Sequence, residues 1–290
     1  MPEIVQHCPL CGSTTQAPFD ERQFRGRSVT NVLCQSCGLV YQSPRMDEAE
    51  SLAFYQAEYR LLYQGQEGPN AKDLKVQSSR ARVTLEFIRP WVKSASRILD
   101  IGCSSGILLQ ELSTNYQAKG IGVEPGEMYR QYAHRTGLEI YPSLDELKQT
   151  SLPPFTLVSM MHVLEHLPNP AGYLVELRTA FLEPEGWLLL EVPNLYAHDS
   201  FEVAHQVAFS PHTLVQVVQK AGFHVIATRA HGQPRSKLIP LYITMLAQPG
   251  FSKEYQLQPE RFVRLQREWG FLRRRLVQRL FPHQACLPVE

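Results

Sequence analysis

The sequence predicts an α/β fold with a mostly parallel sheet, preceded by a small cysteine-rich segment. Three observations predict this fold class. A short apolar strand, a glycine turn and a helix follow one another over 97–112, which is the opening unit of a parallel α/β sheet. Further short apolar runs alternate with helical patterns as far as residue 247. Two CxxC pairs stand ahead of this region.

Composition indicates an ordinary globular chain. Of its 290 residues, 43% are hydrophobic and 20% are charged, and the net charge is +1, so no overall field draws the chain to nucleic acid. No apolar run reaches the roughly 18 residues of a membrane span. The first residues lack the basic and apolar stretches of a signal peptide. We therefore expect a cytoplasmic protein.

The cysteine spacing predicts a metal site. Cys8 and Cys11 form one CxxC pair, and Cys34 and Cys37 form the other. In a reducing compartment this spacing favours metal over disulfides. Four thiolates complete a tetrahedral Zn²⁺ site that is structural, because no position remains for a substrate. A β-hairpin fits between the two pairs, and residues 24–33 have loosely strand-like character around Gly26.

The opening unit of the sheet predicts a ligand site. Asp100 lies at the end of a strand, where open α/β sheets bind ligands. Gly102 and Gly106 bracket a tight turn, and the helix after it offers unpaired N–H groups. The three-glycine fingerprint of dinucleotide-binding dehydrogenases is absent from this turn.

Glu124 ends the next strand, 121–123, at a position that suits ribose binding. An acidic residue about twenty positions beyond the glycine turn can accept hydrogen bonds from both ribose hydroxyls. The alternative is a solvent-facing acid at a strand end. Helix 127–136 and strand 138–141 follow, and Ser143 is a candidate cap for the next helix.

The second half of the sequence continues the alternation. We expect strands at 155–161 and 187–192, helices at 171–182 and 213–220, and a closing antiparallel pair at 222–230 and 238–247. His162, Glu165 and His166 spell H-x-x-E-H, an inverted zinc-peptidase signature. That chemistry needs both histidines on one long helix, whereas here the motif follows a strand directly and Pro168 closes it.

Three stretches together resemble the class I S-adenosylmethionine (SAM) methyltransferases. DIGCSSG at 100–106 resembles the motif D-x-G-x-G-x-G, with Ser104 in place of the middle glycine. HVLEH at 162–166 and LEPEGWLLLEVPN at 182–194 resemble the segments at the fourth and fifth strands of that family. The resemblance covers roughly 94–248. It implies a Rossmann-like sheet of seven strands, the last antiparallel, with helical additions.

The resemblance also implies a SAM site and a division of the chain. The segments would be a zinc ribbon at 1–45, a helical linker or lid at 46–93, the methyltransferase domain at 94–250 and a basic amphipathic helix at 251–290. Tyr55, Tyr59 and Tyr63 are lid candidates or packing residues. The expected SAM-binding residues are Asp100, Gly102, Cys103, Ser104, Gly106, Glu124, Pro125, Ser143, Leu144, Met161 and His162.

Two histidines are candidate bases. His162 lies nearest the reacting methyl in the family arrangement. His205 belongs to the polar and aromatic loop 195–207, which suits a substrate-facing insertion, although it could simply anchor that loop. Asn194 could orient an acceptor hydroxyl or cap the loop. Arg235 and Lys237 could bind an anionic group or face water.

The expected activity is in-line transfer of a methyl group to the oxygen or carbon of a small molecule, with a histidine base. The acceptor would be a sugar, a glycan precursor or a secondary metabolite. One alternative is an RNA methyltransferase that grips its substrate with the zinc ribbon and the C-terminal helix, and another is a non-catalytic SAM-binding module.

The C-terminal helix, expected at 259–281, has an arginine-rich face and an apolar stripe. We expect the stripe to dock on the protein and leave the basic face in solvent. The alternatives are a homodimer contact, an anionic lipid contact and an RNA contact. The apolar stripe comprises Phe262, Leu265, Trp269, Leu272, Leu276 and Leu280.

Overall fold

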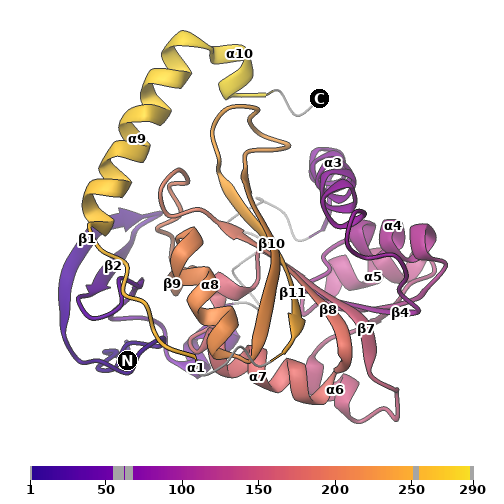
Figure 1. Ribbon diagram of the computed structural model, residues 1–290. Coiled ribbons are helices and arrows are strands. Elements are labelled where there is room, and N and C mark those ends of the chain that lie inside the picture. Colours follow the sequence, from indigo (N-terminus) through magenta and orange to yellow (C-terminus); the bar gives the residue numbers. More distant parts are fainter. Residues whose placement is uncertain (1, 55–61, 63–67, 251–254, 288–290) are drawn as a thin grey trace.

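The computed structural model describes residues 2–54, 62, 68–250 and 255–287 (Figure 1). A seven-stranded sheet forms its centre, in the order β10-β11-β8-β7-β4-β5-β6. Only β11 runs against its neighbours β8 and β10, and the remaining pairs are parallel. The strands are β4 (Arg97–Ile101), β5 (Lys119–Val123), β6 (Glu139–Tyr141), β7 (Phe155–Met161), β8 (Leu182–Pro193), β10 (Phe223–His231) and β11 (Tyr242–Pro249).

Helices cover both faces of this sheet. One face packs against α3 (Ala71–Ile88), α4 (Ile107–Tyr116) and α5 (Glu127–Arg135). The other packs against α6 (Leu144–Lys148), α7 (Pro170–Ala180) and α8 (Pro211–Lys220). Successive side chains of a strand point to opposite faces, so Ile98 of β4 joins the first layer and Leu99 joins the second. The fold class predicted from the sequence is confirmed.

The cysteine-rich segment is joined to the main sheet through a second sheet of four strands. β1 (Gln16–Phe24) and β2 (Arg27–Cys34) form the expected hairpin, whose turn residues Arg25 and Gly26 both have positive φ. β3 (Val40–Gln42) pairs with β2 and with β9 (Val207–Ala208), which comes from the second half of the chain. Leu39 and Tyr41 are buried in the main core.

Most of the expected helices and strands are confirmed. α1 (Glu48–Ala53) lies in the segment expected as a helical linker or lid, and the lid candidates Tyr55, Tyr59 and Tyr63 lie outside the described residues. β8 begins earlier than the strand expected at 187–192, and residues 183–186 lie where its pairing with β7 shifts register. Ser143 caps α6 as expected, because its hydroxyl accepts a hydrogen bond from the Glu146 N–H.

The expectation for the C-terminal helix was wrong about which face docks. α9 (Val263–Leu280) begins beside β1 and extends away from the second sheet along one edge of the molecule to α10 (Pro282–Ala285) (Figure 1). Arginine side chains of α9 donate hydrogen bonds to backbone carbonyls elsewhere in the chain, whereas all six residues of the apolar stripe are more than half exposed. Among the described helices, none combines the length and the apolar character needed to cross a bilayer.

Candidate active site

The turn after β4 requires glycine at two positions, 102 and 106. Gly102 and Gly106 both have positive φ, 69° and 79°. A Cβ on Gly102 would lie 2.5 Å from Val163, and one on Gly106 would overlap the side chain of Leu138. This close packing fixes the residue at which α4 begins. It also places the backbone of the turn directly beside the adjoining cavity.

Glu124 connects this turn to the end of β5. Its carboxylate accepts hydrogen bonds from the Ser104 N–H at 2.9 Å and the Gly126 N–H at 2.8 Å, and its side chain is buried. A carboxylate oxygen has two lone pairs, so these bonds do not exhaust its acceptor capacity. Glu124 also lines the cavity, so its carboxylate is placed to meet a diol there.

Asp100 lies beside it at the end of β4. The carboxyl group is buried and accepts a hydrogen bond from the Ser159 hydroxyl at 2.7 Å. Burial raises the pKa of Asp100 to about 7, although the Ser159 bond acts in the opposite direction. Close to neutral pH, this group therefore exchanges between its charged and its neutral form.

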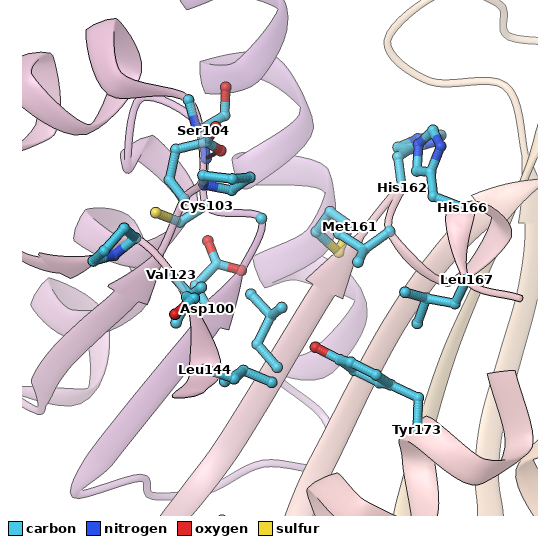
Figure 2. A pocket seen from close by; sticks show the side chains of 18 of the residues that line it. Asp100, Cys103, Ser104, Val123, Leu144, Met161, His162, His166, Leu167 and Tyr173 are labelled. Carbon is cyan, nitrogen blue, oxygen red and sulfur yellow. Dashed lines mark hydrogen bonds between the residues drawn. The ribbon is translucent and has the colours of Figure 1, made fainter. Parts of the chain in front are cut away.

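A cavity of about 1310 Å³ opens along the carboxyl ends of β4, β5 and β7 (Figure 2). It exceeds the roughly 300–1,000 Å³ of a pocket for one small ligand, so a cofactor and an acceptor can share it. Gly106 belongs to the turn but not to the lining. The remaining ten expected SAM-binding residues line the cavity: Asp100, Gly102, Cys103, Ser104, Glu124, Pro125, Ser143, Leu144, Met161 and His162.

α3 closes one side of the cavity and contributes residues that the sequence did not single out. The Ser105 hydroxyl donates to the Gln77 side chain at 2.5 Å, and Gln77 reaches the Ser104 hydroxyl at 3.4 Å. Arg80, one helical turn further on, lines the cavity and forms an ion pair with Glu191 at 3.1 Å. Gln77 and Arg80 belong to a run of four polar residues, 77–80, and nothing in that run indicates which face of α3 lies over the cavity.

His162 is held between two buried carboxylates where β7 ends. Its Nδ1 lies 3.2 Å from Glu165 Oε1 and its Nε2 lies 3.1 Å from Glu191 Oε1. Burial and the charge of Arg80 act to lower the pKa of His162, but the bonds to the two carboxylates outweigh them and raise it. Both ring nitrogens thus face carboxylate oxygens, an arrangement that favours the protonated imidazole.

A second cluster lies next to it. The Nδ1–H of His166 donates to the Ala204 carbonyl at 2.9 Å, and that of His205 donates to the Ser200 carbonyl at 2.8 Å. The two rings are 4.8 Å apart in edge contact. Because a carbonyl can only accept, Nδ1 carries the proton in each ring and Nε2 carries the lone pair.

Glu165 completes this cluster. One ligand atom from each of Glu165, His166 and His205 lies within 4.8 Å of the other two. Among the described residues, no donor reaches Oε2 of the buried Glu165. Burial lowers the pKa of His166 to about 4 and also lowers that of His205. Two neutral imidazoles beside a carboxylate can accept a proton, and they could equally hold a cation.

The expected bases thus occupy different positions. His162 and His166 line the cavity, and Figure 2 shows them side by side, across from Cys103 and Asp100. His205 is not among the lining residues and lies behind His166, within the three-residue cluster. His166, which the sequence analysis names only within the H-x-x-E-H motif, lies on the cavity wall.

The structure also shows the surroundings of Asn194, Arg235 and Lys237, the remaining candidates for acceptor binding. Asn194 donates to the Pro240 carbonyl at 2.8 Å and accepts from the Tyr196 N–H at 3.1 Å, which favours loop capping over acceptor binding. Arg235 lines the cavity and Lys237 does not. Glu191 is the centre of a buried network that also contains His231 and Thr244.

The four predicted zinc ligands come together. Cys8 and Cys37 have their sulfurs 3.5 Å apart, as do Cys11 and Cys34, and all four sulfurs lie within 4.8 Å of one another. Zinc–sulfur bonds of about 2.3 Å put tetrahedral ligands roughly 3.8 Å apart. Each following glycine, Gly12 and Gly38, has the positive φ of a knuckle turn. The donor set therefore fits Zn²⁺.

Comparison with known proteins identifies the family. A family model described as a methyltransferase domain matches residues 75–228. The ubiquinone biosynthesis O-methyltransferase of Nitrosococcus oceani is 36% identical over 118 residues, which cover 38% of this chain and 49% of that protein. Its counterpart from Hahella chejuensis is 34% identical over 85 residues, 27% of this chain and 35% of that protein. The chain thus spans half or less of the length of these relatives.

A solved structure supports the fold. The 1,6-didemethyltoxoflavin-N1-methyltransferase of Burkholderia thailandensis, solved with 1,6-didemethyltoxoflavin and S-adenosylhomocysteine, aligns with a TM-score of 0.56 at 15% identity. The alignment covers 80% of this chain and 99% of that protein. The family match extends over more than half of the chain. The chain therefore belongs to the methyltransferase domain family of class I SAM-dependent enzymes.

Proposed function

We propose that this chain transfers the methyl group of SAM to a hydroxyl oxygen of a small-molecule acceptor. The cavity carries the proposal, because it joins the Glu124 and Asp100 end, which suits a nucleoside, to a wall that presents His162 and His166. The similar proteins named as O-methyltransferases favour oxygen as the acceptor atom. When bound, SAM supplies an activated methyl group with its own leaving group.

The residues of this chain then have distinct roles. Glu124 would accept hydrogen bonds from the ribose hydroxyls, and the turn at 102–106 would hold the amino-acid end of SAM. Alignment of acceptor, methyl carbon and sulfur supplies most of the rate enhancement, because the reaction needs little else from the protein.

His166 would take the acceptor proton. Its Nε2 carries the lone pair, because Nδ1 donates to Ala204. As the proton arrives, the Glu165 carboxylate stabilises the imidazolium, and its charge already acts to raise the pKa of His166 against burial. His205, in contact behind the ring, is a positioning residue for His166. His162, with both nitrogens engaged by carboxylates, would orient Glu165 and Glu191 rather than act as the base.

The RNA alternative loses part of the basic face that it required. Arg264, Arg267 and Arg274 of α9 are hydrogen-bonded to backbone carbonyls of the protein itself. These three guanidinium groups are therefore poor contacts for the phosphates of RNA, and the net charge of +1 gives no overall attraction to nucleic acid.

Removal of His166 tests the proposed base. In His166→Ala we expect kcat to fall by about 10²–10⁴-fold, the usual contribution of a general base, while the Kd for SAM changes less than threefold. His205→Ala should lower kcat by about tenfold. The measurement uses methyl-labelled SAM and a panel of hydroxylated small molecules, each paired with its O-methylated form, with total RNA as a separate arm.

The control for this test is His224→Ala, because His224 is exposed on β10 and does not line the cavity. Unchanged turnover in His166→Ala would reject the base assignment. Label in RNA, or label in the O-methylated compounds at the rate of the free hydroxyls, would reject the proposed acceptor.

Asp100 gives the proposed site a pH dependence. SAM carries sulfonium and ammonium cations, so its binding favours the ionised form of a carboxyl whose pKa is raised to about 7. The affinity should therefore fall as pH drops below 7, by up to about tenfold per pH unit, and level off above pH 8. Calorimetry between pH 5.5 and 8.5 measures this. In Asp100→Asn the affinity for SAM should depend less steeply on pH. An identical pH dependence in that variant would exclude Asp100 as the group responsible.

A further inference from the structure

α9 is anchored to the protein through its polar face. Arg264 donates to the Phe19 carbonyl at 3.1 Å and Arg274 to the Ala197 carbonyl at 2.9 Å. The guanidinium of Arg267 lies 4.1 Å from the ring centre of Phe201. Gly270 marks the closest approach, because a Cβ there would overlap the Tyr196 carbonyl oxygen. The helix is thus held in one orientation.

Both ends of the α9–α10 segment are fixed as well. Val263 at the start of α9 is buried, and so is Ala285 at the end of α10. The backbone of α10 and its following residues bonds to the loop between β10 and β11, at Lys237 and Arg235. A helix pinned along its length in this way cannot roll over to bury its other face.

The apolar stripe therefore points outward. Phe262 is 72% exposed and Trp269 is 70% exposed, and the four leucines of the stripe are each more than half exposed. Six large apolar side chains in one row make a patch of the kind that marks an interaction site. Phe281, at the junction with α10, is half exposed.

Exposed arginines border the stripe. At 100° per residue, Arg273 follows one edge of the stripe, and Arg275 and Arg279 follow the other, with Glu268 as the acidic residue among them. All of these side chains are exposed. The border of the stripe is therefore cationic, and a partner that covers it must be apolar in the centre and anionic around it.

A second copy of this chain does not match these requirements. The spacing of the stripe approximates a coiled-coil seam, but Arg279 would then occupy a core position and the tryptophan and phenylalanine would occupy positions that favour aliphatic side chains. Two such helices would also bring their arginine borders together. A bilayer surface with anionic headgroups matches both the apolar stripe and its cationic border. Its phosphates can pair with the arginines, and the Trp, Phe and Leu side chains can insert at the boundary of the acyl chains.

We propose that α9 is a peripheral membrane-binding helix that lies flat on an anionic lipid surface, with the apolar stripe inserted and the bordering arginines at the headgroups. The charge of the border and the aromatic content of the stripe carry the proposal. It does not depend on the acceptor or on the catalytic base.

Vesicle binding of the zinc-loaded full chain tests the proposal. The probes are vesicles of phosphatidylcholine alone and vesicles with about 30% phosphatidylserine, at 0.1 M salt. We expect at least tenfold stronger partitioning to the anionic vesicles, and at least a tenfold loss in Trp269→Glu. The combined change of Arg273, Arg275 and Arg279 to glutamine should lower partitioning several-fold and weaken its salt dependence.

Trp91→Glu is the matched control, because Trp91 is an exposed tryptophan far from α9 in sequence. It should partition like the unaltered chain. Unchanged SAM affinity in each variant would show that the protein remains folded. Absence of binding to anionic vesicles, or equal losses in Trp269→Glu and Trp91→Glu, would overturn the proposal. So would a stable dimer in sedimentation that Trp269→Glu dissociates while vesicles bind neither form.

Discussion

Glu124→Ala is expected to weaken SAM binding by about 10²–10⁴-fold. The carboxylate would lose two hydrogen bonds to the ribose, and bonds to a charged group contribute about 1.5–3 kcal/mol each. The same change removes the acceptor for the Ser104 and Gly126 N–H groups, so the turn also loses its connection to β5. Isothermal calorimetry with SAM and with S-adenosylhomocysteine gives both affinities.

Glu139→Ala provides the matched control for this substitution. Glu139 lies on the neighbouring strand β6, where it pairs with the exposed Lys119 and does not line the cavity. Its removal changes the same charge without touching the proposed ribose site, and SAM affinity should stay within twofold. Melting temperatures of both variants separate a loss of binding from a loss of folding. Equal SAM affinity in Glu124→Ala and the unaltered chain would remove the ribose assignment.

Cys34→Ser is expected to abolish zinc binding and to destabilise the chain well beyond its N-terminal segment. The four-cysteine cluster is continuous with the main core, because Cys34, Cys37, Leu39 and Tyr41 pack in the same apolar cluster as the central sheet. A loss of about 4 kcal/mol would lower Tm by about 8–16 °C in a domain of this size. Zinc content by mass spectrometry and thermal unfolding measure the two effects.

Cys286→Ser is the control, since Cys286 is exposed near the C-terminus. It should keep one equivalent of zinc and an unchanged Tm. If the Cys34→Ser protein retained a full equivalent of zinc, or if the unaltered chain prepared under reducing conditions held little, the four-thiolate site would be excluded.

The arrangement of the glycine turn and Glu124 was predictable because it depends on residues that are close together in the sequence. A tight turn between a buried strand and a helix needs glycine, and Gly102 and Gly106 each stand where a Cβ would clash. An acid that ends the next strand must lie at the same sheet edge, which places Glu124 beside the turn. The cysteine pairs were predictable for the same reason, since CxxC spacing alone brings two sulfurs together.

The histidine wall of the cavity was less predictable because it depends on contacts between distant segments. His166 and His205 were both noticed in the sequence, but only the pairing of β3 with β9 and the path of the 195–207 loop bring the two rings together. Arg80 reaches Glu191 from a helix more than a hundred residues earlier. No pattern within a short stretch of sequence indicates that such distant residues come into contact.

The C-terminal helix shows the limit of hydrophobic patterning. An apolar stripe is ordinarily buried, and that general preference led to the wrong face for α9. The arginine stems and Gly270 fit closely against the loop at 195–201, and backbone carbonyls there accept from the guanidinium groups. This fit depends on the shape of the loop, which the sequence of α9 does not contain.

A structure of the full chain with S-adenosylhomocysteine bound would test the central claim most directly. We expect the nucleoside to lie across the carboxyl ends of β4 and β5, with both ribose hydroxyls within hydrogen-bond distance of Glu124 and the amino-acid end over the turn at 102–106. The sulfur should face His162 and His166. Density for the ligand elsewhere, or a ribose without contact to Glu124, would contradict the proposed site.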